Sequence, residues 1–169
     1  MDFVLRPLAP ADIPSLQRVY DACPSAFLRR LGRVAAPEQA ASDYGQAQAT
    51  PGRFQFGIQL DGELIGLVDC KLDDSREGVA HLGLLLLIPS FDDPKIASLS
   101  LRILTSWLAD SFAVHRVETD VLAHDSETIR YWAGEGFAFT GEQTRRDLPG
   151  YAPRLLVMAK DLLPPQAAP

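Results

Sequence analysis

Two residues near the middle of the chain have side chains that could move a proton. His81 stands near the start of a leucine-rich run, and Glu77 precedes it in a polar stretch. Imidazole groups ordinarily titrate at about pH 6.5, and carboxylates also accept protons, so either side chain could act as a general base. The alternatives are a hydrogen-bonded strand histidine and a solvated turn glutamate. The other histidines, His115 and His124, flank a predicted strand and are expected at the surface.

Residue spacing gives little support for metal or disulfide chemistry. The two cysteines, Cys23 and Cys70, form neither a disulfide framework nor a metal-binding pattern. No cluster of histidine, cysteine and acidic residues has the spacing of metal ligands. The simplest interpretation is two reduced thiols in a cytoplasmic protein. The sequence therefore predicts no metal site and a cytoplasmic location.

The charge balance narrows the range of partners. Sixteen Lys and Arg residues against 22 Asp and Glu residues give a net charge of −6. Nucleic acids and anionic membrane surfaces need a basic footprint, which is not evident, whereas a cationic amine suits an acidic protein. The longest apolar run, 82–88, is too short to span a bilayer, which takes about 20 residues. The first residues show no signal peptide.

The length and composition are those of an ordinary globular protein. The chain has 169 residues, of which 47% are hydrophobic and 22% charged. These values predict a single domain, which we place at residues 1–163, with a flexible Pro/Ala tail at 164–169.

The hydrophobic periodicity switches repeatedly between that of strands and that of helices. Strands are predicted at 3–6, 54–60, 64–72, 79–88, 117–122, 137–139 and 155–159. Helices are predicted at 11–22, 26–31, 37–49, 96–108 and 126–135. The near-continuous leucines of 79–88 indicate a central strand buried on both faces. The helix at 96–108 then links this strand to the one at 117–122, and such strand–helix–strand units place their strands in parallel.

Three segments, taken in order, carry a resemblance to a known family. They are the strand and turn from Ala80 to Phe91, the amphipathic helix from Ile96 to Trp107, and the segment from Asp125 to Phe137, which ends in Gly-Phe. Over roughly residues 3–161, the chain resembles the GNAT superfamily of acyl-CoA-dependent N-acyltransferases. The resemblance implies an α/β (α+β) fold with a mixed, mostly antiparallel sheet of about seven strands. It also implies helices on both faces and a central βαβ unit.

The resemblance implies an activity as well. An acetyl group would pass from acetyl-CoA to a primary amine of a small molecule or peptide, and the family also favours a homodimer. His81 stands where some family members have a catalytic Glu or His, so it is the expected base, with Glu77 as the second candidate. The family's frequent general acid, a tyrosine, is replaced by Trp132. The side chain of Trp132 shares a helix face with Ile129, which predicts a core position.

The resemblance also assigns binding residues. Contacts with the CoA co-substrate are expected from the end of the leucine-rich strand and from two helix starts. These residues are Leu86, Leu87, Ile88, Lys95, Ile96, Ala97, Ser98 and Asp125. For Asp125, the alternative is a simple helix N-cap. The amine substrate is expected against Phe27, Leu31, Tyr44 and Arg145.

The phosphate-binding loop departs from the family pattern Gln/Arg-x-x-Gly-x-Gly/Ala, whose backbone amides hold a pyrophosphate at a helix N-terminus. Asp92 replaces the basic or amide residue, and Lys95 replaces the first glycine. Asp93 followed by Pro94 is an ordinary N-cap and first-turn pair. The alternative function is therefore a catalytically degenerate GNAT-like binding or regulatory module with weak or no CoA binding.

Overall fold

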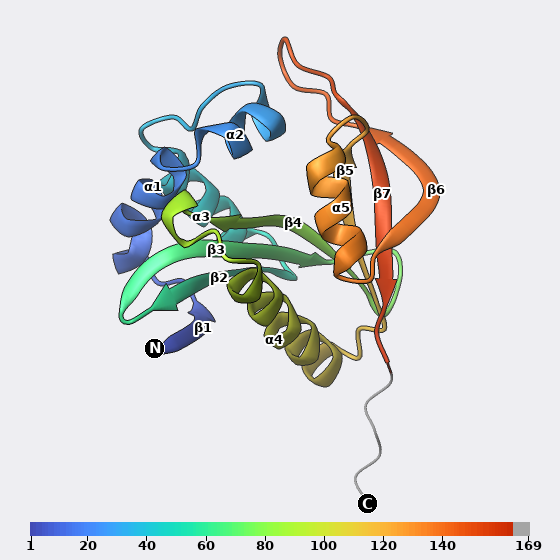
Figure 1. Ribbon diagram of the computed structural model, residues 1–169, viewed down its shortest axis with the longest axis horizontal. Coiled ribbons are helices and arrows are strands. Elements are labelled where there is room, and N and C mark those ends of the chain that lie inside the picture. Colours follow the sequence, from blue (N-terminus) through green and yellow to red (C-terminus); the bar gives the residue numbers. More distant parts are fainter. Residues whose placement is uncertain (164–169) are drawn as a thin grey trace, which may run out of the picture. The chain divides into compact units, whose positions relative to one another are not determined.

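Seven strands form one mixed sheet in the computed structural model, which describes residues 1–163 (Figure 1). They are β1 (Phe3–Pro7), β2 (Arg53–Leu60), β3 (Glu63–Leu72), β4 (Val79–Leu87), β5 (Arg116–Leu122), β6 (Ala138–Arg145) and β7 (Arg154–Asp161). Their order in the sheet is β1-β2-β3-β4-β5-β7-β6. The helices are α1 (Ile13–Asp21), α2 (Pro24–Leu31), α3 (Gln39–Ala49), α4 (Pro94–Phe112) and α5 (Ser126–Gly134), with short 3-10 turns at Pro10–Asp12 and Pro89–Phe91.

Strand pairing agrees with the predicted fold class. The β1–β2, β2–β3, β5–β7 and β6–β7 pairs are antiparallel. The β4–β5 pair is parallel, with Val79–Leu82 opposite Arg116–Thr119. Since α4 connects these two strands, the predicted central βαβ unit is confirmed. The mostly antiparallel seven-stranded sheet and its α/β class are confirmed too.

The chain divides into two compact units, which we describe separately. Among the described residues, unit 1 comprises residues 1–71 and 83–100, and unit 2 comprises residues 72–82 and 101–163. The single domain over 1–163 stays a prediction. The predicted tail at 164–169 lies outside the described residues.

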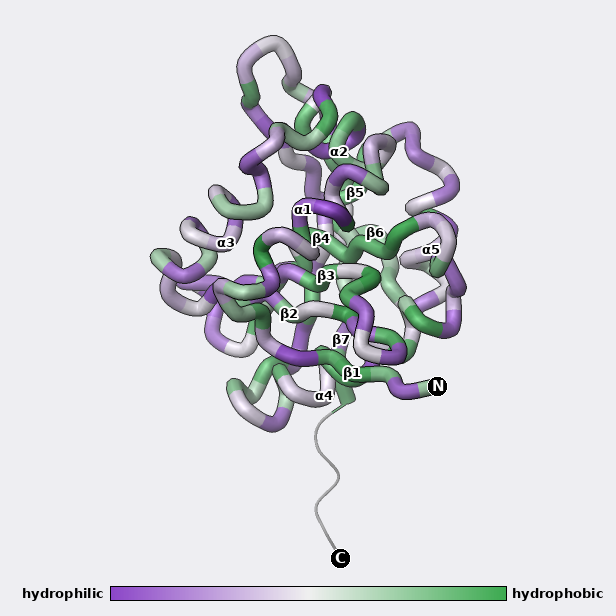
Figure 2. Tube along the Cα trace, turned by 90° about the vertical axis from the view of Figure 1, so that its left-hand side faces the viewer, coloured by the Kyte–Doolittle hydropathy of each residue, from purple (hydrophilic) through white to green (hydrophobic). Residues whose placement is uncertain are grey.

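Unit 1 has a core built from amphipathic helices and the apolar face of its strands. Tyr20 of α1 and Phe27 of α2 are both buried, with ring centroids 4.6 Å apart. The trace of α2 carries both green hydrophobic and purple hydrophilic stretches in Figure 2, as an amphipathic helix requires. The helix begins at Pro24 and ends where Gly32 adopts a left-handed φ of 71°. The sequence pattern predicts that the helix starts after Pro24. Proline nevertheless fits the first helical position, because an N–H group at that position would have no partner within the helix.

Unit 2 has a core that includes Trp132 of α5. This side chain is buried and lies edge-on to Phe137, with ring centroids 4.9 Å apart. Asp125 caps α5, since its Oδ1 accepts the amide proton of Thr128. Gly136, with a φ of 91°, turns the chain after the helix. The predicted core position of Trp132 and the N-cap role of Asp125 are both confirmed.

Besides the bounds of some helices, two predicted strands differ from the structure. β6 extends from Ala138 to Arg145, well beyond the predicted 137–139, and almost all of it is exposed. An edge strand exposed on both faces has no alternation of apolar and polar residues, so its sequence carries no strand signal. β4 occupies the predicted central position, but Gly83 is exposed and Leu84 and Leu85 are half-buried. The prediction that β4 is buried on both faces is therefore wrong for the second half of the strand.

Replacement of Trp132 by alanine is expected to lower the free energy of unfolding by about 3–5 kcal/mol, because a large buried side chain is lost and a cavity remains. Urea unfolding measures the change. Phe139→Ala is the matched control: its side chain is 54% exposed, so its loss should stay under about 1 kcal/mol. A loss under about 1 kcal/mol for Trp132→Ala as well would contradict the core role.

Candidate functional site

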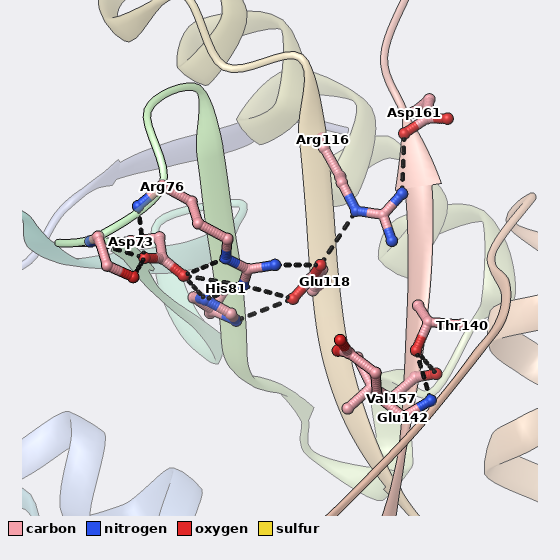
Figure 3. A network of polar contacts seen from close by, with 10 residues as sticks. Asp73, Arg76, His81, Arg116, Glu118, Thr140, Glu142, Val157 and Asp161 are labelled. Carbon is pink, nitrogen blue, oxygen red and sulfur yellow. Dashed lines mark hydrogen bonds and ion pairs between the residues drawn. The ribbon is translucent and has the colours of Figure 1, made fainter.

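His81 lies at the centre of a charged network in unit 2 (Figure 3). Its Nε2 is 2.7 Å from Asp73 Oδ2, and its Nδ1 is 3.8 Å from Glu118 Oε2. Arg76 bridges the two carboxylates, because its Nη2 lies 2.8 Å from Asp73 Oδ2 and 2.9 Å from Glu118 Oε2. The imidazole is thus bordered by two carboxylates and one guanidinium.

The turn between β3 and β4 places Asp73 beside the ring. Asp73 Oδ1 accepts the amide protons of Ser75 and Arg76 and the hydroxyl proton of Ser75. The Asp73 amide in turn donates to the carbonyl of Val79. Gly78 closes the turn with a φ of 76°, a conformation that other residues rarely adopt. The carboxylate is therefore fixed by the backbone that leads into β4.

β5 places Glu118 on the other side of the ring. Glu118 is directly opposite His81 in the parallel register, and its side chain is only 3% exposed. Besides Arg76, it accepts a hydrogen bond from Arg116 Nε at 3.0 Å, and Arg116 also pairs with Asp161 of β7. The hydrogen bond from Arg76 is the main cause that lowers the pKa of Glu118 below its ordinary value. This buried carboxylate is thereby held in its charged form.

Asp73 is held in its charged form as well. The hydrogen bond with His81, followed by those from Ser75 and Arg76, holds the pKa of this carboxyl well below its usual range. An ionised carboxylate beside an imidazole orients the ring and stabilises the imidazolium that forms when the ring takes a proton. With 39% of its side chain exposed, His81 is accessible to a proton donor from outside.

The network contains residues that the sequence analysis missed, namely Asp73, Arg76, Arg116 and Glu118. A signal was present for two of them: Arg116 and Glu118 alternate with the buried Val117 and Thr119 of β5, and charges at such positions can face a common partner. Glu77, the second predicted base, lies exposed in the same turn and is not one of the residues that form the network. Its catalytic role stays a prediction.

The predicted CoA contacts at the end of β4 lie in unit 1. Leu86 is buried in the core of this unit. The carbonyl of Leu87 accepts a hydrogen bond from the Cys23 thiol, and the amide of Ile88 donates to the carbonyl of Ile65. The backbone groups of Leu87 and Ile88 that make these contacts are thus already used within the chain.

The start of α4 likewise satisfies its own amides. Asp93 Oδ1 accepts the amide proton of Lys95 at 2.9 Å, and the carbonyl of Asp93 accepts those of Ile96 and Ala97. Pro94 has no amide proton. Ser98 follows in the next turn and is half-buried. The N-cap expected from Asp93 is therefore present, and it uses the donors that would hold a phosphate at a helix N-terminus.

The remaining predicted contacts are distributed over both units. Asp125 of unit 2 is engaged as the cap of α5, where its Oδ2 also accepts the hydroxyl proton of Thr128. Of the predicted substrate residues, Phe27, Leu31 and Tyr44 share the core region of unit 1, Phe27 buried and the other two partly buried. Arg145 is exposed at the end of β6 in unit 2. The positions of these residues do not show whether they contact a substrate or CoA, so their binding roles stay predictions.

Glu118→Gln is expected to lower the free energy of unfolding at pH 7 by about 1–3 kcal/mol. Breaking a fully buried ion pair would cost more stability, but Arg76 and Arg116 are partly exposed, so water can hydrate them once the Glu118 charge is gone. Because folding lowers the pKa of Glu118, its stabilisation is fully present above the unfolded-state pKa and fades as the pH falls. Urea unfolding should therefore show a wild-type advantage at about pH 6–7 that shrinks below about pH 4. An advantage independent of pH would contradict a charged Glu118.

The described part of the chain contains neither a ready group of metal ligands nor a helix that could span a membrane. Within residues 1–163, no group of three or more His, Cys, Asp and Glu side chains is arranged to hold a metal ion. In the same range, no helix is long and apolar enough to cross a membrane.

The sheet with its central βαβ unit is the fold of acetyltransferases. An acetyltransferase from Thermus thermophilus shares 23% identity and a TM-score of 0.77, covering 96% of this chain and 98% of that chain. The spermidine N-acetyltransferase from Vibrio cholerae, solved with CoA and spermine, shares 13% identity and a TM-score of 0.75, covering 94% and 95%. A ribosomal-protein-alanine N-acetyltransferase from Brucella melitensis shares 18% identity and a TM-score of 0.72, covering 94% and 99%.

The sequence itself places the protein within this class. The acetyltransferase (GNAT) domain matches residues 2–138. The chain belongs to the GNAT acetyltransferase family. No curated protein sequence matches it.

Proposed function

We propose that the protein is an N-acetyltransferase that moves an acetyl group from acetyl-CoA to a primary amine, with His81 as the general base. The observation that carries the proposal is the position of His81 in a GNAT chain: a half-exposed imidazole on β4, bordered by the ionised carboxylates of Asp73 and Glu118. A net charge of −6 is compatible with a cationic amine as substrate. The cytoplasmic location and the homodimer stay predictions.

The proposed reaction needs one proton acceptor on the protein, because the amine must lose a proton before it can attack. At neutral pH the amine arrives as an ammonium ion, and His81 takes a proton from it, directly or through water. The neutral nitrogen then attacks the thioester carbonyl carbon, so that the C–N bond forms and the C–S bond breaks. The amide nitrogen releases its remaining extra proton to solvent. The CoA thiolate leaves and is protonated by water, since Trp132 has no acidic proton to give and is buried.

Binding of acetyl-CoA at the family position requires a change at the start of α4. Relatives from Vibrio cholerae and Thermoplasma acidophilum were solved with CoA. In this chain the Asp93 carboxylate would have to release the amide of Lys95 before a phosphate could bind there. A carboxylate about 6 Å from a phosphate costs about 2–3 kcal/mol at an effective dielectric of 20. Lys95 offers a compensating charge.

The same observation supports the second candidate function, a GNAT-like binding or regulatory module with weak or no CoA binding. The Asp93 carboxylate occupies the start of α4, where a phosphate of CoA would have to bind. The two functions differ in one measurable property, since only the enzyme must bind acetyl-CoA productively.

Two measurements on the wild-type protein separate these functions. The first follows release of the CoA thiol from acetyl-CoA with a panel of amines, for example a polyamine, a small monoamine and a peptide with a free N-terminal alanine. The second is calorimetric titration with acetyl-CoA alone. The proposal expects thiol release that depends on protein and amine. Binding at 100 times Kd should also stabilise the fold by about 2.7 kcal/mol. Absence of both turnover and binding would favour the module.

A further inference from the structure

The contacts of His81 determine which ring nitrogen is available to take a proton. Nε2 lies 2.7 Å from Asp73 Oδ2, whereas Nδ1 lies 3.8 Å from Glu118 Oε2, too far for a hydrogen bond. A neutral imidazole has one N–H and one lone pair, so a nitrogen that donates to a carboxylate leaves the other as the base. We propose that Asp73 is a positioning residue that holds His81 in its Nε2–H tautomer and so makes Nδ1 the proton-accepting atom. The catalytic part of this inference rests on the proposed function.

The Asp73 carboxylate can accept a hydrogen bond from the ring but cannot donate one. Its Oδ1 is occupied by three donors from Ser75 and Arg76. Its Oδ2 receives Arg76 Nε at 3.0 Å and Arg76 Nη2 at 2.8 Å besides facing the ring. These donors favour the ionised carboxylate and fix its orientation. Because an ionised carboxylate only accepts, the nitrogen at 2.7 Å must carry the proton.

Two elements supply the charged groups that face the ring, and a third lies behind them. The β3–β4 turn supplies Asp73 and Arg76, and β5 supplies Glu118, with Arg116 behind it. β7 supplies Asp161, which reaches Arg116 and not the ring. Figure 3 shows the ring of His81 between Asp73 and Glu118. The two carboxylates thus lie on opposite sides of the imidazole and favour opposite tautomers.

Asp73→Asn should therefore reverse the tautomer. Glu118 would then be the ionised carboxylate beside the ring, on the Nδ1 side. Arg76 Nη2, a donor 3.3 Å from Nε2, favours a lone pair on that nitrogen. Both effects move the proton to Nδ1. The lone pair would then point toward Arg76, where it cannot accept a proton from a substrate.

Nitrogen-15 NMR of the histidine rings at alkaline pH measures the tautomer directly. The chain has only three histidines, so His115→Gln and His124→Gln assign the His81 signals by elimination. The wild type is expected to show a protonated Nε2 and an unprotonated Nδ1, and Asp73→Asn the reverse. The matched control Asp161→Asn removes the same charge from an exposed residue that contacts only Arg116 of the network, and should resemble wild type.

A neutral wild-type His81 ring that carries its proton on Nδ1 would overturn the inference. This measurement uses the wild-type protein alone, so it does not depend on whether a variant folds. An unchanged tautomer in folded Asp73→Asn would overturn it too. In the acetyltransfer assay, Asp73→Asn should lower kcat about 10²- to 10⁴-fold, with little change in KM for acetyl-CoA. Retention of kcat within about threefold of an active wild type would contradict the positioning role. An inactive wild type with the expected tautomer would instead contradict the proposed function alone.

Discussion

His81→Ala is expected to lower kcat for acetyl transfer about 10²-fold or more while leaving acetyl-CoA binding nearly unchanged. The reason is that the variant removes the proton acceptor of the reaction, and general-base catalysis contributes about 10²- to 10⁴-fold. Steady-state kinetics with a saturating amine gives kcat, and calorimetry gives the affinity for acetyl-CoA. The kcat ratio should be largest at low pH and fall as the pH rises, because more of the amine is then already neutral.

His124→Ala is the matched control for this variant. It removes the same kind of side chain from an exposed position outside the network and should keep wild-type kinetics. Because His81 also contacts Asp73, urea unfolding of His81→Ala shows whether a kinetic loss reflects the fold. Activity of folded His81→Ala within about threefold of wild type over pH 6–9 would exclude His81 as the base.

The double variant Asp92→Arg/Lys95→Gly is expected to bind acetyl-CoA roughly 30- to 1000-fold more tightly than wild type. The arginine replaces a repulsive charge with an attractive one, which more than offsets the Lys95 charge that is lost, and glycine lets the backbone approach a phosphate closely. Together these changes are worth about 2–4 kcal/mol locally before screening by salt. Calorimetric titration at two ionic strengths measures the gain, which should fall as salt rises.

The structure adds a third position to this test. Asp93 remains as the N-cap in the double variant, and in wild type its carboxylate accepts the amide proton of Lys95. A triple variant with Asp93→Ser keeps a capping oxygen and removes one more negative charge, so its affinity should rise further. Asp110→Arg, an exposed charge reversal elsewhere on α4, is the control for net charge. If double and triple variants bind no better than wild type, charge is not the obstacle at this helix end.

Much of the architecture could be predicted because its elements have strong periodicity and clear boundaries. The Asp61-Gly62 turn joins β2 and β3 as predicted, with positive φ at both residues. The helix–strand alternation from 79 to 122 correctly indicated the parallel pair. β6 could not be predicted over its full length, because an exposed edge strand needs no apolar face. The extent of α4 beyond 108 was missed because helix ends lack a periodic signal.

The candidate site was less accessible from the sequence. His81 could be singled out by residue type and by position on β4. Its partner Asp73 is eight residues away across a turn, and Glu118 comes from a strand that follows a whole helix. Which polar residues meet depends on strand register, which pairs His81 with Glu118. Register is a property of the folded sheet, so single residues of the network could be recognised but not their grouping.

The Asp93 side chain at the start of α4 can also be considered as a competitor of phosphate that is part of the chain itself, because both would use the amide of Lys95. It is tethered two residues from the amide that it occupies, so dilution cannot remove it, unlike a free inhibitor. A phosphate ligand at this helix end would bind only the fraction of molecules in which this carboxylate has moved away. If that fraction were about 1%, the apparent Kd would be about 100-fold weaker than the intrinsic one. Affinity for the co-substrate would then depend on a local opening equilibrium, which a neighbouring cation such as Lys95 could shift by holding the displaced carboxylate.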